Sequence, residues 1–230
     1  MSPRKAPVSR RERPAKPALS REGIVTAAVG ITRTAGLDKL TMRRLAQELD
    51  TGAASLYVYV SDIEELHAAV LDDFLGEVDL AAAEGPADWR ERLRALMDSY
   101  RAVLFEQPSL ARVALVTRLS GPHYLRVVDA ALGLLVEGGL SDYGAALAMD
   151  QLFLMATASA VENGTRATMP NAHRQHETLI EEIDAISAGE YPTIARLGRT
   201  LVAGSAAGRA QWAFDALLNG ALATRDPEDL

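Results

Sequence analysis

The chain of 230 residues contains no cysteine. This excludes disulfide bridges, thiol-based redox sensing and cysteine-ligated zinc. The chain also lacks an apolar run of the ~18 residues that a membrane-spanning helix needs. Its most apolar stretch, residues 140–161, is interrupted by Asp142, Asp150 and Gln151, so we interpret it as a buried helix and expect no membrane span. The charged N-terminus is not followed by an apolar segment, which argues against a secretory signal and predicts a cytoplasmic protein.

Signatures of catalysis are missing as well. The sequence has no Gly-x-Ser-x-Gly, no His-Glu-x-x-His and no phosphate-binding glycine loop. His173 and His176 form a His-x-x-His pair followed by Glu177, which could present metal ligands on one helix face. Because no third histidine or cysteine lies nearby, a solvated polar face is the simpler interpretation. We expect no catalytic residue, no cofactor and no metal, and leave open whether the histidine pair binds one.

What the sequence does contain is a succession of helix signals at its N-terminal end. Ser20 can cap a helix that ends at Gly36, and Thr41 can cap a second one. Residues 50–52, Asp-Thr-Gly, then separate this second helix from a new apolar set made of Ala53, Leu56 and Val60. Two short helices joined by a tight turn are typical of a helix-turn-helix, whose second helix enters the DNA major groove.

A fourth helix is expected to follow directly. Ser61 and Glu64 have the spacing of a capping box, so this helix should begin near Asp62 and continue through Phe74, away from the head.

The remainder of the chain also reads as helices, without an alternating strand pattern or an internal repeat. With 48% hydrophobic residues, the chain can hold a small head and a larger domain with its own core. Caps, prolines and glycines predict helices over residues 88–107, a shorter stretch up to 119, 122–138, 141–163, 171–187 and 205–223. We therefore expect an all-α protein with an N-terminal three-helix helix-turn-helix head and a larger helical domain.

Three short segments of the head resemble a known family. They are Thr41-Met-Arg-Arg-Leu-Ala46, Ser55-Leu-Tyr57, and Ser61 with Glu64-Glu65-Leu66. Over about residues 20–70 the chain resembles the DNA-binding segment of the TetR/AcrR family of bacterial regulators, and residues 214–220 resemble the last helix of TetR-type ligand domains. The chain departs from the family at Asp50, usually glycine, at Tyr59, commonly histidine, and at Ile63, often a lysine that contacts phosphate.

Charge is divided unevenly along the chain. Residues 1–60 hold 11 Lys and Arg against 5 Asp and Glu, or +6, and the remainder holds 13 against 26, or −13, which together give the net charge of −7. Such asymmetry steers the basic end onto phosphates. Prolines interrupt the basic arm at residues 1–18, so we expect it to be disordered without DNA and to follow a narrow A·T-rich minor groove. A tail that only raises solubility is the alternative.

The resemblance implies a set of DNA contacts in the head. Arg43 is expected at a guanine edge and Arg44 at a phosphate. The second helix offers few long polar side chains for base edges. The remaining recognition of the DNA sequence is therefore expected from thymine methyl contacts, a serine hydroxyl and tyrosines at the groove wall. For Tyr57, a position in the core of the head is the alternative. The predicted DNA-binding residues are Arg10, Arg11, Arg13, Thr41, Arg43, Arg44, Gly52, Ala53, Ser55, Tyr57 and Tyr59.

The family also implies a small-molecule effector bound between body helices and a homodimer paired through its last helices. The residues expected to line the effector site are Met97, Tyr100, Phe105, Arg118, His123, Met149 and Phe153. Those expected at the dimer interface are Trp212, Phe214, Leu217 and Leu218, which could instead face their own core.

These observations predict a homodimeric repressor that binds a palindromic double-stranded DNA operator and is released by the effector. The expected domains are a basic arm (1–18), a DNA-binding domain (19–66) and an effector-binding and dimerisation domain (67–230). An activator or a ligand-independent regulator is the alternative within the class. A small-molecule binding protein or enzyme with a vestigial head is the alternative outside it.

Overall fold

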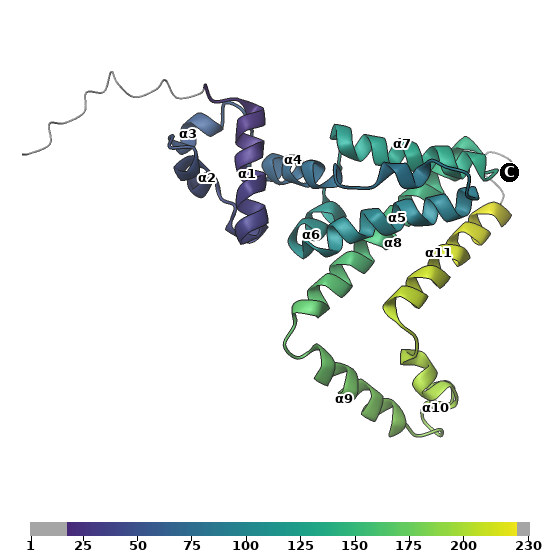
Figure 1. Cartoon of the computed structure of the whole chain (residues 1–230). Coiled ribbons are helices and arrows are strands. Elements are labelled where there is room, and N and C mark those ends of the chain that lie inside the picture. The colour runs from purple at the N-terminus through teal and green to yellow at the C-terminus, as the bar shows by residue number, and fades with distance from the viewer. Residues whose placement is uncertain (1–17, 225–230) are drawn as a thin grey trace, which may run out of the picture.

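A computed structural model describes residues 18–224, and every regular element in that range is a helix. A small head leads through α4 into a larger body, from which α9 and α10 project (Figure 1). The head contains α1 (Arg21–Ala35), the 3₁₀ helix η2 (Leu37–Lys39), α2 (Met42–Glu48) and α3 (Ala53–Leu56), and α4 (Ile63–Leu75) follows. The body contains η3 (Leu80–Ala83), α5 (Trp89–Phe105), α6 (Pro108–Val116), α7 (Pro122–Glu137), α8 (Asp142–Thr168), α9 (Ala172–Asp184), α10 (Pro192–Leu197), η4 (Gly198–Val202) and α11 (Ala206–Ala223). The all-α prediction is confirmed.

The helices of the head begin and end where the sequence places their caps. The Ser20 hydroxyl accepts a hydrogen bond from the N–H of Gly23 at 3.1 Å, and the Thr41 hydroxyl accepts one from the N–H of Arg44 at 3.1 Å. Gly36 ends α1 with a φ of 84°, which glycine adopts at no steric cost. Buried apolar side chains from all of these helices form the core beneath: Ile24, Ala28, Leu45, Ala46, Leu56 and Val60.

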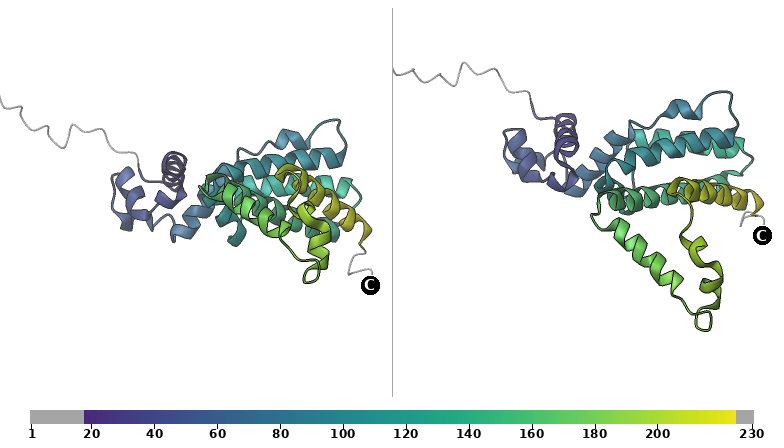
Figure 2. Two further views of the ribbon diagram at one scale, coloured as in Figure 1. Left: turned by 90° about the horizontal axis from the view of Figure 1, so that it is seen from below. Right: turned by 60° about the horizontal axis from the view of Figure 1, so that its bottom comes forward.

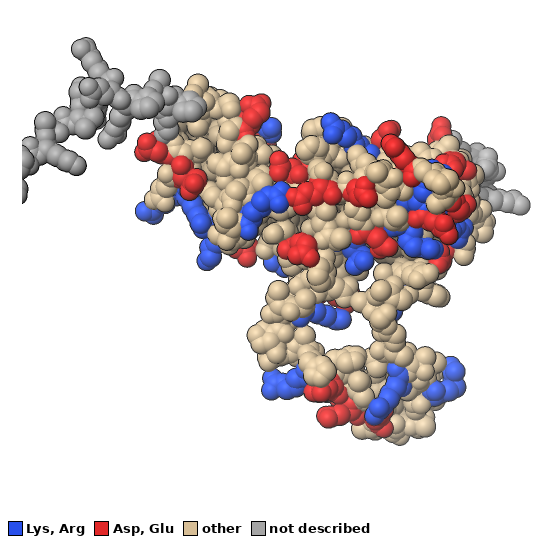
Figure 3. All heavy atoms as spheres, viewed as in Figure 1, with Lys and Arg blue, Asp and Glu red and all other residues tan. Residues whose placement is uncertain are grey.

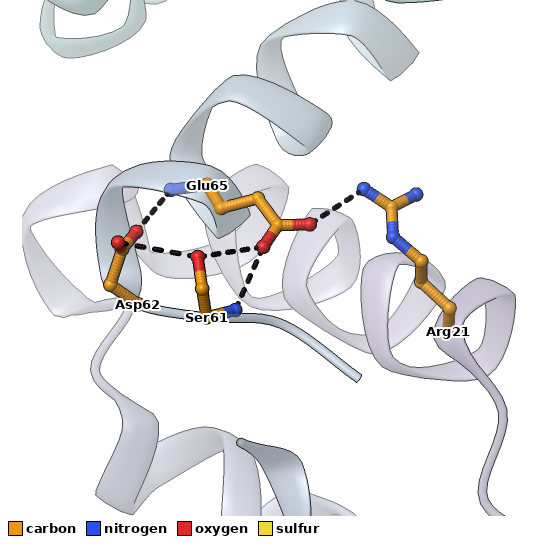
Figure 4. Close-up of polar contacts among 4 residues, drawn as sticks. All are labelled: Arg21, Ser61, Asp62 and Glu65. Carbon is orange, nitrogen blue, oxygen red and sulfur yellow. Dashed lines mark hydrogen bonds and ion pairs between the residues drawn. The ribbon is translucent and has the colours of Figure 1, made fainter. Parts of the chain in front are cut away.

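The start of α4 differs from the prediction by one residue. Asp62, not Ser61, is the N-cap, and its carboxylate accepts a hydrogen bond from the N–H of Glu65 at 2.7 Å (Figure 4). The Glu65 carboxylate accepts the backbone N–H of Ser61 at 2.7 Å and pairs with Arg21 of α1 at 3.1 Å. The predicted pairing of Ser61 with Glu64 is therefore wrong, because an aspartate caps as well as a serine and Glu65 is the carboxylate that reaches back.

Glu65 and a second ion pair fix α4 to α1. The hydrogen bond from the Ser61 backbone, and then that from Arg21, lower the pKa of Glu65. At the other end of α1, Arg33 pairs with Glu77 and stacks its guanidinium over the Phe74 ring, 4.5 Å from the centroid. Two ion pairs and a cation–π contact therefore join α1 to α4 and to the residue two positions beyond its end.

The body is organised around α8. Helices α5, α6, α7 and α11 all pack against it, and the right view of Figure 2 shows α9 and α10 projecting away from this body. Among the described helices, α8 is the one whose length and composition would allow it to cross a membrane. Its packing against four other helices is that of a core helix.

Some helix ends in the body differ from the prediction. Helix α6 ends at Val116 instead of near residue 119, and α8 continues to Thr168 instead of ending near Asn163. Gly164 lets this extension of α8 pack closely against the end of α5, because a Cβ there would lie 2.9 Å from the carbonyl oxygen of Phe105. The short helices η3, α10 and η4 were not predicted.

Helix α4 belongs to both predicted domains. The boundary expected between residues 66 and 67 falls inside this helix, which is continuous from Ile63 to Leu75. Any displacement of α4 relative to the body therefore displaces the head.

Candidate DNA-binding surface and effector core

Most of the residues predicted to contact DNA lie at the surface of the head. Arg43 is exposed and Arg44 half-buried on the first turn of α2. Within residues 18–224, no hydrogen bond or ion pair engages either guanidinium, so both are available to a ligand. Thr41, Gly52 and Ser55 are exposed as well, and Figure 3 shows Lys and Arg side chains along the lower edge of the head.

The segment that ends the helix-turn-helix exposes two large side chains. Tyr57 is 53% exposed, so it is a surface residue and not a core aromatic. Val58 is 79% exposed, and sequence reasoning did not select it. The sequence carried a signal for it, since Leu56 belongs to the apolar set expected to face the core, and a residue two positions later on a helical turn points to the opposite side.

Two other predicted DNA contacts are more enclosed. Ala53 and Tyr59 are half-buried and pack against the core. Both therefore contribute to the stability of the head, and only part of each side chain can meet DNA. Arg10, Arg11 and Arg13 lie outside the described residues.

The location of the basic surplus follows from the sequence. Residues 1–17 carry six Lys and Arg against one Glu, or +5, and residues 18–60 carry five Lys and Arg against four Asp and Glu, or +1. The helices of the head are thus nearly neutral, and the +6 of residues 1–60 comes mainly from the arm.

In the body, two of the predicted effector residues meet in a buried aromatic cluster between α5, α7 and α8. The rings of Tyr100 and Phe153 lie 4.8 Å apart, and Tyr124 contacts Phe153 edge-on at 6.1 Å. The Tyr100 hydroxyl forms a hydrogen bond with the Thr157 hydroxyl at 2.9 Å. Burial raises the pKa of Tyr100 to about 12, so at neutral pH this hydroxyl is a neutral donor or acceptor inside an apolar core.

The other predicted effector residues are spread around this cluster. Met97 is buried, Phe105 and Met149 are half-buried, and Arg118 is exposed. His123 lies at the start of α7, where its ring nitrogen Nδ1 is 2.9 Å from the carbonyl oxygen of Asp72 on α4. Arg118 is therefore not part of the buried cluster, and His123 is engaged with the helix that carries the head.

A separate recess of about 870 Å³ lies between the C-terminal half of α8, α9, η4 and α11. It is visible as an opening between the body and the projecting helices in Figure 3. Met155, Glu162, Asn163, His173, Leu179 and Arg209 are among the residues that line it. None of the predicted effector residues is among them.

The histidine pair does not form a metal cluster. His173 is paired with Glu177 at 3.1 Å, and both side chains are exposed. Across residues 18–224 there is no group of three or more His, Cys, Asp or Glu side chains arranged to hold a metal ion.

The predicted dimer residues divide into two sets. Phe214 and Leu218 are buried within their own chain, with the Arg94 guanidinium 5.2 Å from the Phe214 ring centroid. Their assignment to a dimer interface is therefore wrong, because their spacing of four residues places both on the face of α11 that packs inward. Leu217 is half-buried, and Trp212 is 74% exposed.

An exposed apolar stripe runs along α8. It consists of Tyr143, Leu147 and Leu154, which recur at helical spacing on one face. We refer to these three residues as the α8 stripe. On the neighbouring α11, Trp212 and Leu222 are exposed as well.

An exposed helix-turn-helix joined by a shared helix to a helical body defines the class of this protein: it is a DNA-binding transcriptional regulator. The chain belongs to the TetR family, since residues 81–222 match the family model described as tetracyclin repressor-like, C-terminal domain. It is 31% identical over 190 residues to the HTH-type transcriptional repressor DrrR1 of Streptomyces coeruleorubidus, a match that covers 79% of this chain and 70% of that protein. The alternative of a binding protein or enzyme with a vestigial head is not favoured.

Two solved structures extend the similarity to about nine-tenths of the chain. A Streptomyces coelicolor protein described as a transcription regulator is 50% identical, with a TM-score of 0.78 over 92% of this chain and 98% of that chain. ActR from Streptomyces coelicolor, in complex with actinorhodin, is 33% identical, with a TM-score of 0.78 over 89% of this chain and 97% of that chain.

Proposed function

We propose that this protein is a cytoplasmic, homodimeric repressor whose two heads bind a palindromic operator and whose body binds a small-molecule effector that releases the DNA. The observation that carries this proposal is the continuity of α4, which is fixed to the head by Arg21 and Arg33 and packs within the body against α6 and α7. A change in the body is thereby transmitted to the head without an intervening flexible joint.

At the operator, Arg43 reads a guanine edge and Arg44 contacts a phosphate. Ser55, Tyr57 and Thr41 contact the groove wall and the backbone, since their side chains are exposed. The arm, including Arg10, Arg11 and Arg13, enters the adjacent minor groove and supplies most of the positive charge.

The effector site is built on the cluster of Tyr100, Phe153 and Tyr124. This cluster offers aromatic faces and a pair of hydroxyls between α5, α7 and α8, which suits an aromatic ligand with a few polar groups. The similarity to ActR bound to actinorhodin makes actinorhodin the first probe. Met97, Phe105 and Met149 line the remainder of the site.

Two copies pair through the α8 stripe and Trp212. These side chains are apolar and exposed, and an isologous interface uses the same surface patch on both copies. Pairing spaces the two heads for half-sites one helical turn of DNA apart, about 34 Å.

The experiment that tests this function is a selection of genomic fragments by the purified protein at physiological salt, followed by titration of the selected duplex with actinorhodin. We expect an enriched palindrome, and a probe that releases it. Release from nearly full to nearly empty occupancy requires roughly a 10⁴-fold preference of the probe for the released state, about 5.5 kcal/mol. Fragments with no common sequence would refute operator recognition, and a bound probe that leaves DNA affinity unchanged would refute release by this ligand.

A further inference from the structure

The last turn of α4 and the first turn of α7 cap each other. Asp72 is the one buried residue with a charged side chain in the described part of the chain. Its carboxylate accepts hydrogen bonds from the backbone N–H groups of Tyr124 at 2.9 Å and His123 at 3.4 Å. In the opposite direction, Nδ1 of His123 lies 2.9 Å from the carbonyl oxygen of Asp72, so a protonated Nδ1 donates to it.

Helix α7 has no cap of its own. Gly121 stands at its N-cap position without a side chain, and Pro122 follows without an N–H. The first free donors of the helix are therefore those of His123 and Tyr124. Asp72 accepts both, which is the role that a local serine, threonine or aspartate has at other helices, and its negative charge lies at the positive end of the helix dipole.

Two glycines allow the helices to approach this closely. A Cβ at Gly121 would lie 2.1 Å from the Asp72 carboxylate carbon, and a Cβ at Gly76 would lie 2.9 Å from Nδ1 of His123. A larger residue at Gly121 would displace the Asp72 carboxylate, and one at Gly76 would displace the His123 ring, so a substitution at either position disturbs the contact between the two helix ends. By contrast, nothing lies within 4 Å of a Cβ added at Gly133, in the same helix α7.

We propose that this reciprocal cap between Asp72 and the first turn of α7 is the positioning element that holds the heads at the spacing an operator requires. The inference rests on the proposed function. Helix α4 carries the head, and α7 contributes Tyr124 to the proposed effector site, only one residue from His123. A buried carboxylate that loses its donors is costly to leave unpaired. The contact is therefore made or broken as a unit, and an effector that displaces the first turn of α7 breaks it.

Gly121→Ala is the sharpest variant, because it disrupts the cap without changing any donor or acceptor. Gly133→Ala is its matched control in the same helix. Asp72→Ala removes the acceptor itself, and Asp72→Asn keeps one carbonyl oxygen as a conservative replacement. Circular dichroism of the full chain is used to check whether each variant remains folded.

Two readouts are taken on each variant. Amide hydrogen exchange of the segment 121–126 reports whether the cap is intact and needs no DNA. Binding is then measured to the selected palindrome and to a duplex in which one half-site is scrambled. A residue with only a structural role would change both affinities alike, whereas a residue that positions the heads affects the palindrome alone.

We expect faster exchange and a loss of palindrome affinity of roughly 5- to 150-fold in Gly121→Ala and Asp72→Ala, with unchanged affinity for the single half-site. Asp72→Asn should lie between these variants and the wild type, and Gly133→Ala should match the wild type. Faster exchange with unchanged palindrome affinity, or an equal loss on both duplexes, would overturn the proposal. Retention of the palindrome by the wild type tests the proposed function independently, so the two can fail separately.

Discussion

The caps of the head helices and the cap of helix α7 in the body differ in how far apart the paired residues lie along the sequence. In the head, α1 and α2 are capped by Ser20 and Thr41, each three residues from the N–H that it accepts. In the body, α5, α8 and α11 also have local caps, but α7, which packs against α4, is capped by Asp72, more than fifty residues away in the chain. The difference indicates that the head is a self-contained unit for reading DNA, whereas the position of that unit depends on packing between distant parts of the chain.

The largest effect is expected from separating the two bodies. Leu147→Glu combined with Leu154→Glu changes two exposed residues of the α8 stripe, so one chain should remain folded while the dimer dissociates. Operator affinity should fall by about 10²-fold or more, because the second head loses its effective concentration at the operator. Sedimentation and DNA binding on the same samples give the measurement.

Leu125→Glu, an exposed leucine on α7, is the control for this pair. It should leave the protein dimeric. A wild type that sediments as a monomer, or a monomeric variant with full operator affinity, would contradict the assignment of the interface.

Removal of the arm tests how much of the head's affinity is electrostatic. Deleting residues 1–17 removes six basic residues. The slope of log K against log salt should become shallower by about 0.9 for each phosphate that the arm of one subunit no longer neutralises. An unchanged slope would show that the arm does not touch DNA.

The two arginines of α2 distinguish base reading from backbone contact. Arg43→Ala should relax the preference at one operator position by about 1–3 kcal/mol, while Arg44→Ala should weaken all sequences alike. Affinities for an operator and its single-base variants provide the comparison. Equal losses on every sequence in both variants would remove Arg43 from base readout.

Tyr100→Phe tests the buried hydrogen bond between the Tyr100 and Thr157 hydroxyls in the body. It leaves the buried Thr157 hydroxyl without its partner, so the free energy of unfolding should fall by about 1–3 kcal/mol near neutral pH. The pKa of Tyr100 is raised from 10.0 to about 12 in the folded chain. Because the folded state favours the protonated hydroxyl, the raised pKa contributes to the free energy of unfolding. This contribution is present below pH 10 and is lost as the pH rises through 12.

The stability gap between wild type and Tyr100→Phe should therefore narrow in alkaline solution, by about 1 kcal/mol near pH 11. Denaturant unfolding of both proteins from neutral to alkaline pH measures it. A gap that stays constant above pH 10 would show that the hydroxyl is not buried as described.

The smallest effect is expected at the local cap of α2. Thr41→Ala should cost about 1 kcal/mol of stability, since one N–H of the first turn loses its acceptor. Thr41→Ser keeps the hydroxyl and should behave as the wild type. Thermal unfolding compares the three proteins, and a Thr41→Ala variant as stable as Thr41→Ser would mean that the cap is not needed.

The same difference, between caps that are local in the sequence and a cap supplied by a distant residue, explains which features the sequence could predict. The caps at Ser20 and Thr41 and the helix end at Gly36 are local patterns, and the structure confirms them. The cap of α7 could not be predicted, because no local residue signals it and Asp72 lies in another helix.

The candidate sites follow this rule as well. The exposed positions of Arg43 and Tyr57 follow from a short motif. The inward packing of Phe214 and Leu218 depends on which neighbour covers α11, and an apolar stripe alone does not distinguish its own core from a partner. Val58 was not predicted as a surface residue of the head, because an aliphatic side chain is ordinarily expected in the core.

The central claim, that the head recognises a specific operator, is tested most directly by a ratio of two dissociation constants. These are measured at physiological salt for the selected palindrome and for a duplex of the same composition with both half-sites scrambled. The account predicts a preference for the palindrome of about 10³-fold or more, as is typical of specific DNA-binding proteins. Equal affinity for the two duplexes would contradict it.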